Sequence, residues 1–66
     1  MNIILNGESV NIEENISISG LLESRGVSVS SAVVEYNGNI IPKDKFDDTV
    51  IESDAVIEVL SFVGGG

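Results

Sequence analysis

The C-terminus is the segment whose residue types point most clearly to chemistry, because Gly64, Gly65 and Gly66 are the last three residues. Glycine lacks a Cβ and adopts dihedrals closed to other residues, so such a segment can thread a narrow channel in another protein. Three extended residues reach about 10 Å. Adenylation by ATP would make a carboxylate oxygen a leaving group, after which sulfur gives a thiocarboxylate and an amine gives an isopeptide. The candidate reactive group is therefore the carboxylate of Gly66, and the alternative is an inert frayed end.

Missing residue types exclude most catalytic chemistry. The chain has 66 residues, no cysteine and no histidine. It therefore lacks a Ser-His-Asp triad, a cysteine nucleophile and a histidine general base. It also lacks a disulfide and a cysteine/histidine zinc site, and it contains no P-loop or dinucleotide-binding glycine motif. We predict that the protein is not an enzyme and that it binds no metal or cofactor itself.

The charge balance limits the partners. Eleven acidic residues against three basic ones give a net charge of −8. Such a surface repels nucleic acid and anionic lipid, and it favours a partner protein with a basic docking face. The adjacent carboxylates at residues 13–14 and 47–48 are expected to be solvated rather than to bind metal. Because the chain has no long apolar run and no N-terminal signal pattern, we expect a cytoplasmic protein without membrane or nucleic-acid partners.

The N-terminal segment predicts a β-hairpin. Residues 2–6 and 9–13 are typical of strands, and Asn6-Gly7 between them is a strong signal for a tight turn. Alternation along the two strands places four apolar residues on one face, toward a common core. These residues are Ile3, Leu5, Val10 and Ile12.

A short helix is predicted next, over about residues 18–25, because apolar residues there recur at helical spacing. Ser17 is a suitable N-cap, and Gly26 lies where a glycine commonly ends a helix. Gly20 lowers the intrinsic stability of this helix. Packing on a sheet must therefore stabilise it.

Three further strands are predicted over residues 32–36, 39–41 and 55–62. Pro42 ends the second of them because proline cannot donate to a ladder, and Phe46 is expected to tuck inward from an irregular turn. One short helix among four or five strands must cover one face of a mixed sheet.

The predicted fold class is therefore α+β, with a β-grasp arrangement. Its first and last strands would lie parallel at the centre of the sheet and be joined by a long crossover. Residues 1–63 would form the single domain, and residues 64–66 a flexible glycine tail.

The last predicted strand has two distinct faces. One carries Ile57 and Val59, and the other carries a charge and three apolar residues. The charged face is expected to point away from the helix, which would leave Val56, Leu60 and Phe62 exposed beside Ile4 as a protein interface. Two alternatives are that the loop around Phe46 covers these side chains and that the two faces are inverted.

Three segments resemble the ThiS family, the sulfur carriers of bacterial thiamine biosynthesis. They are Leu21-Leu22-Glu23 in the helix, the run Tyr-Asn-Gly-Asn-Ile-Ile-Pro-Lys over residues 36–43, and the ending Phe-Val-Gly-Gly-Gly over residues 62–66. The resemblance covers the whole chain. Gly65 and Gly66 match the terminal Gly-Gly of the family, and Gly64 is an addition that lengthens the tether.

The resemblance implies a function with several partners. A ThiF-type adenylating enzyme would use ATP and magnesium to adenylate Gly66. Sulfur from a cysteine-derived persulfide on a donor protein would then leave a thiocarboxylate, and thiazole synthase (ThiG) would take up the sulfur. Two alternatives stay open: the small subunit of molybdopterin synthase, which shares the terminal Gly-Gly, and a β-grasp binding module that works through its exposed face alone.

Overall fold

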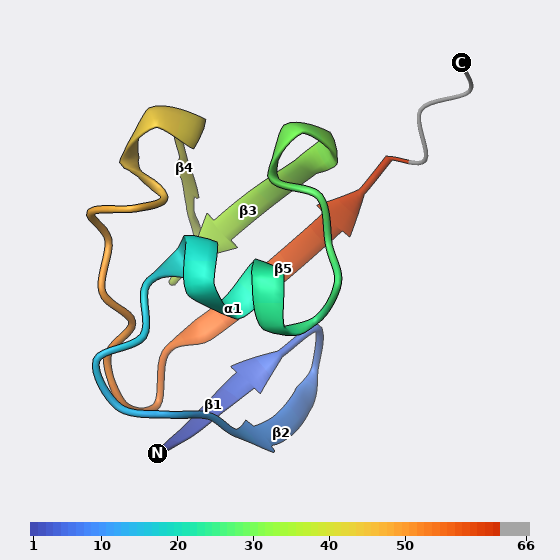
Figure 1. Cartoon of the computed structure of the whole chain (residues 1–66). Coiled ribbons are helices and arrows are strands. Elements are labelled where there is room, and N and C mark those ends of the chain that lie inside the picture. The colour runs from blue at the N-terminus through green and yellow to red at the C-terminus, as the bar shows by residue number, and fades with distance from the viewer. Residues whose placement is uncertain (63–66) are drawn as a thin grey trace.

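The computed structural model describes residues 1–62, which form one mixed β-sheet with a single α-helix across one face (Figure 1). The strands follow the order β2-β1-β5-β3-β4. This confirms the predicted α+β class and β-grasp arrangement. The elements are β1 (Asn2–Leu5), β2 (Glu8–Asn11), α1 (Ile18–Ser24), the 3₁₀ turn η1 (Val29–Ser31), β3 (Ala32–Tyr36), β4 (Asn39–Ile41), the 3₁₀ turn η2 (Lys43–Lys45) and β5 (Val56–Ser61).

The first and last strands lie side by side at the centre of the sheet and run parallel, as predicted. Ile4 lies opposite Val56, and Leu5 lies opposite Ile57. A parallel pair needs a long crossover, which here includes α1, β3 and β4. On its other edge β5 pairs antiparallel with β3. The last strand therefore has a hydrogen-bonded neighbour on both sides.

Two Asn-Gly turns close the antiparallel hairpins β1–β2 and β3–β4. In the first turn φ is 50° at Asn6 and 83° at Gly7, and in the second it is 50° at Asn37 and 85° at Gly38. Positive φ at both central residues is the requirement of the type I′ turn, which Asn-Gly meets best. The turn predicted at Asn6-Gly7 is therefore confirmed.

Three strands are shorter than predicted, and the first of them, β1, ends at Leu5 rather than at residue 6. β2 begins at Glu8 and ends at Asn11 rather than at residue 13, although hydrogen bonding continues for one more residue, since the Ile12 N–H donates to Met1 O at 2.8 Å. β5 lacks the first and last residues of the predicted range 55–62. Phe62 nevertheless continues the pairing of β5 with the segment that leads into β3, since its N–H donates to the carbonyl of Ser31 at 2.8 Å.

The start of α1 is set by Ser17. Its side-chain oxygen accepts a hydrogen bond from the Gly20 N–H at 3.0 Å, which confirms the predicted N-cap. The structure also gives a packing reason for Gly20. A Cβ at this position would lie 2.9 Å from Cγ1 of Ile16, so the glycine allows Ile16 to pack against the first turn.

The end of α1 has the geometry of a Schellman motif. Arg25 is the C-cap rather than the last helical residue, and Gly26 follows with φ of 71°. The Val27 N–H donates to Leu22 O at 2.9 Å, and the Gly26 N–H donates to Glu23 O at 3.1 Å. These two bonds satisfy carbonyls that the helix leaves unpaired.

The core lies between α1 and the sheet. Phe46, which is 1% exposed, belongs to it as predicted, and the loop that carries Phe46 is joined to the helix because the Ser19 N–H donates to Phe46 O at 3.2 Å. Burial of these apolar residues is the main stabilising contribution in a domain without a disulfide. The buried set is Ile3, Ile12, Ile18, Leu21, Leu22, Ala32, Val34, Phe46, Ile51, Ala55 and Ile57.

Candidate functional site: the last strand and its open face

The predicted reactive group lies outside the described residues. Gly66 and its tether, Gly64 and Gly65, follow residue 62, the last that the structure describes. What the structure defines is the strand from which they extend. The assignment of Gly66 as the modified residue remains a prediction, and the geometry of β5 determines where the C-terminal segment begins.

Strand β5 is held firmly along its length. Its register with β3 runs from Tyr36 opposite Ile57 to Ala32 opposite Ser61. Phe62 extends the pairing by its bond to Ser31. Residues 63–66 therefore start from a fixed point at the end of a central strand.

The two turn asparagines also bind β5, one from each side. Asn37 donates its N–H to Val56 O at 2.8 Å, and its Oδ1 accepts the Val56 N–H at 2.8 Å. Asn6 donates its N–H to Ile57 O at 2.9 Å, and its Oδ1 accepts the Val59 N–H at 2.8 Å. Sequence reasoning assigned Asn6 to a turn and predicted no contact between either asparagine and β5. The long-range bonds were missed because no local pattern encodes the partner.

The predicted interface residues lie on the sheet face opposite α1, which we call the open face. Val56 is 46% exposed, and Leu60 and Phe62 are each 60% exposed. Ile57, between them on the other face, is fully buried. The loop around Phe46 does not cover the open face, because Phe46 packs into the core with the helix. The proposed orientation of the strand is thus confirmed, and inversion of the faces is excluded.

Ile4 joins this face as predicted. It is half-buried and lies directly opposite Val56 in the parallel register. A further member was missed: Ile40 on β4 is 68% exposed. The signal was available, since alternation places Ile40 and Ile41 on opposite faces, and Ile41 packs against the core.

Two carboxylates lie next to each other on the open face, on adjacent strands. Glu35 on β3 is directly opposite Glu58 on β5, and Ile40 is opposite Glu35 on its other side. Both glutamates are exposed. Directly opposed residues in an antiparallel pair have Cβ atoms about 5 Å apart. The open face is therefore an apolar surface interrupted by one pair of negative charges.

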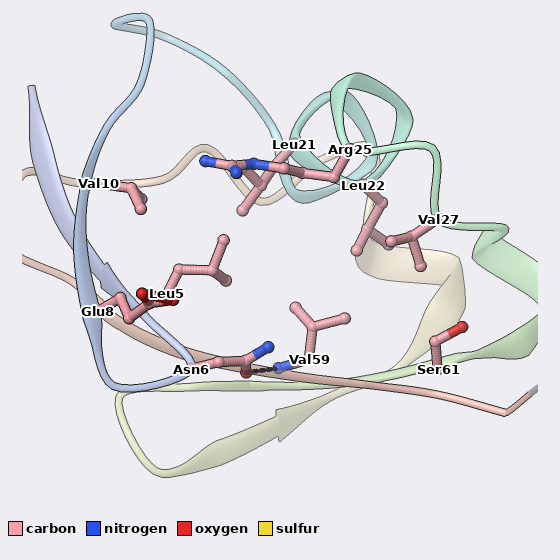
Figure 2. A pocket seen from close by; sticks show the side chains of 10 residues that line it. All are labelled: Leu5, Asn6, Glu8, Val10, Leu21, Leu22, Arg25, Val27, Val59 and Ser61. Carbon is pink, nitrogen blue, oxygen red and sulfur yellow. Dashed lines mark hydrogen bonds between the residues drawn. The ribbon is translucent and has the colours of Figure 1, made fainter.

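A separate cleft of about 340 Å³ lies on the helix side of the sheet (Figure 2). Figure 2 shows the Arg25 side chain extending from the end of α1 toward the part of the cleft where Val10 lies. The charged side chains in its lining are those of Arg25 and Glu8. No lining residue was predicted as a site residue. The lining consists of Leu5, Asn6, Glu8, Val10, Leu21, Leu22, Arg25, Val27, Val59 and Ser61.

None of the three basic residues is part of a strand. Arg25 caps α1, and Lys43 and Lys45 lie in η2. Lys43 Nζ donates to the carbonyl of Ser30 at 2.7 Å. Within residues 1–62 no group of three or more acidic side chains is placed to hold a metal ion. In the same part of the chain, no helix is both long enough and apolar enough to cross a membrane.

Fold and site together define a class: a ubiquitin-like β-grasp domain whose central last strand leads into a C-terminal glycine segment. The ThiS family model matches residues 3–66, and the chain belongs to the ThiS family. The crystal structure of the thiamine biosynthesis protein ThiS from Geobacter metallireducens is similar over its whole length. The TM-score is 0.84 at 30% identity, with 100% of both chains covered.

Two curated relatives are named thiazole synthase. The protein from Magnetococcus marinus is 36% identical over 66 residues, and the protein from Paramagnetospirillum magneticum is 30% identical over the same length. In both cases the match covers 100% of this chain but 20% of the relative. The chain therefore spans about a fifth of the length of these relatives.

Proposed function

We propose that this chain is a sulfur carrier of thiamine biosynthesis, and that it is a substrate of other enzymes rather than a catalyst. The family match carries the proposal, because it runs over residues 3–66 and so includes the terminal Gly65 and Gly66. Similarity to the Geobacter metallireducens ThiS over the whole of both chains supports it. The absence of cysteine means that sulfur carried by this chain must sit on the C-terminal carbonyl.

The proposed chemistry begins with activation of the terminal carboxylate by a ThiF-type adenylating enzyme, which holds ATP and magnesium. A carboxylate oxygen of Gly66 attacks the α-phosphorus of ATP, the bond to pyrophosphate breaks, and an acyl adenylate forms. The terminal sulfur of a protein persulfide attacks the acyl carbon, and AMP leaves. A thiol then reduces the S–S bond of the acyl disulfide, which frees the thiocarboxylate on Gly66.

Thiazole synthase is the proposed acceptor of the sulfur. Two proteins named thiazole synthase contain a region similar to this entire chain within a longer polypeptide. A carrier domain and the enzyme that consumes its sulfur gain from such an arrangement, because linkage raises the effective concentration of one at the other. We expect the present chain likewise to deliver its sulfur to a thiazole synthase.

The open face is the proposed docking surface, with Val56, Leu60, Phe62 and Ile4 as its contacts. Exposed apolar side chains gathered on one sheet face are typical of a protein interface. Docking there would fix the position of Phe62 on the partner. Because four extended residues reach at most about 13 Å, the partner's reactive groups must lie within that distance of Phe62.

Adenylation tests the role of the terminus directly. Two variants, one lacking Gly66 and one with an alanine added after it, should both lose ATP–pyrophosphate exchange by the adenylating enzyme. Their thermal melting should match that of the unmodified chain, because neither change touches residues 1–62. Continued exchange with the chain that lacks Gly66 would refute the proposal.

The intact mass of the protein from its native host gives a second test. The proposal requires an oxygen-to-sulfur increment that maps to the C-terminal residue. The synthase that co-purifies with the thiocarboxylated chain then distinguishes thiazole synthase from molybdopterin synthase. A chain that never carries the increment under sulfur-replete growth would contradict the carrier role.

A further inference from the structure

The carboxylates of Glu35 and Glu58 form an unfavourable arrangement on the open face. The β3–β5 register places them directly opposite each other. Like charges in such a cross-strand pair destabilise a sheet. Apolar residues surround the pair: Ile40 is opposite Glu35, and Val56 and Leu60 flank Glu58 along β5.

The chain itself does not offset this repulsion with a cation on the sheet. None of its strands carries a lysine or arginine. The three basic residues lie in the C-cap of α1 and in η2. With a net charge of −8, the surrounding field adds to the repulsion. We therefore expect the pair to cost stability in the isolated protein, and no strand within residues 1–62 supplies a cation to it.

We propose that the Glu35–Glu58 pair receives a lysine or arginine side chain of thiazole synthase when that enzyme covers the open face. This inference rests on the proposed function. To it, the inference adds that the contacting residue of the partner is positively charged and lies beside Glu35 and Glu58. Exposed Val56, Leu60 and Ile40 would exclude water around the ion pair, and lower water access strengthens such a contact. Charge complementarity of this kind sets register and association rate at interfaces.

Thiazole synthase is the occupant because two proteins of that name carry a region similar to this whole chain. A second copy of the chain is a poor occupant, since it would bring two further carboxylates and another net charge of −8 to the same surface. The occupant must instead present an apolar surface with a basic residue near its centre.

The test compares three single variants of the full chain: Glu35→Gln, Glu58→Gln and Glu8→Gln. The third is a matched control, because Glu8 is an exposed strand glutamate opposite Leu5, which packs toward the helix side. Each variant loses one negative charge. Affinity for the thiazole synthase of the same organism is measured by calorimetry at low and physiological salt, and melting is followed by circular dichroism.

We expect opposite effects on stability and binding. Removing one member of the pair should raise the melting temperature by about 2–5 °C and weaken binding by about tenfold. Glu8→Gln should change binding less than twofold. A merely structural role of the glutamates would move the melting temperature without moving affinity.

Two results overturn the inference: unchanged affinity of both open-face variants for thiazole synthase, and an equal loss of affinity with Glu8→Gln. Failure of the proposed function is recognised separately, because the unmodified chain would then lack the oxygen-to-sulfur mass increment. A chain that carries the increment but shows no pair-dependent binding refutes the inference alone.

Discussion

The Asn6 side chain provides a sharp test of how β5 is held. Its Oδ1 accepts the Val59 N–H at 2.8 Å across 53 residues of sequence. The substitution Asn6→Gly keeps the positive φ of 50° accessible but removes the acceptor. A hydrogen bond of this kind contributes about 1 kcal/mol net, which corresponds to about a fivefold change in the opening equilibrium of the Val59 amide.

Amide hydrogen exchange provides the assay, with Asn37→Gly as the crossed control. Asn37 Oδ1 accepts the Val56 N–H at the same distance of 2.8 Å on the other edge of β5. Asn6→Gly should therefore speed exchange at Val59 about fivefold more than at Val56, and Asn37→Gly should do the reverse.

Two further substitutions separate the contributions at the first turn. Asn6→Asp retains an oxygen acceptor and should preserve the protection of Val59. Asn6→Ala should cost about 1 kcal/mol more unfolding free energy than Asn6→Gly, because alanine at positive φ is strained. Equal changes at both amides in both glycine variants would refute the local hydrogen bonds, since only global opening would then have changed.

Four other substitutions probe the core, the helix and the open face. Phe46→Ala should lower the unfolding free energy by about 3–5 kcal/mol in urea titration, because the ring is almost fully buried; a loss below 1 kcal/mol would contradict its place in the core. Gly26→Ala should cost about 1–2 kcal/mol through strain at φ of 71° alone, since a Cβ there meets nothing within 4 Å. Gly20→Ala should lower the melting temperature because its Cβ would lie 2.9 Å from Cγ1 of Ile16, and this loss should disappear in the background of Ile16→Ala, which removes Cγ1; thermal melting measures both. Leu60→Ser should change unfolding free energy by less than about 0.5 kcal/mol and weaken binding to thiazole synthase; unchanged affinity would remove Leu60 from the interface.

Much of the fold follows from local patterns in the sequence. A type I′ turn requires positive φ at both central residues, and Asn-Gly meets this requirement best, so these dipeptides specify tight hairpins. The Ser17 cap and the Gly26 end delimit the helix because each satisfies backbone groups that the helix leaves unpaired. Alternation in the last strand predicted its two faces because a strand has a side-chain period of two.

The features that sequence reasoning missed depend on pairing between distant segments. Glu35 and Glu58 are 23 positions apart, and their opposition follows from the β3–β5 register. The bonds of Asn6 and Asn37 to β5 depend likewise on which strands become neighbours. The role of Gly20 required the position of Ile16 in space. Local patterns identify such residues but do not give their partners.

The register of β5 with β3 determines both which residues are buried and which charges lie together on the open face. A slip of one residue would move Ile57 to the open face and carry Glu58 toward the core. Burial of an unpaired carboxylate is costly, so Glu58 disfavours the slipped register, as does the exposure of Ile57. A second glutamate directly opposite contributes repulsion without further specificity of register, and Gln at position 35 would fit the exposed site as well. Glu35 therefore adds charge to the open face without adding specificity to the register, and the proposed partner cation is the group that would use this charge.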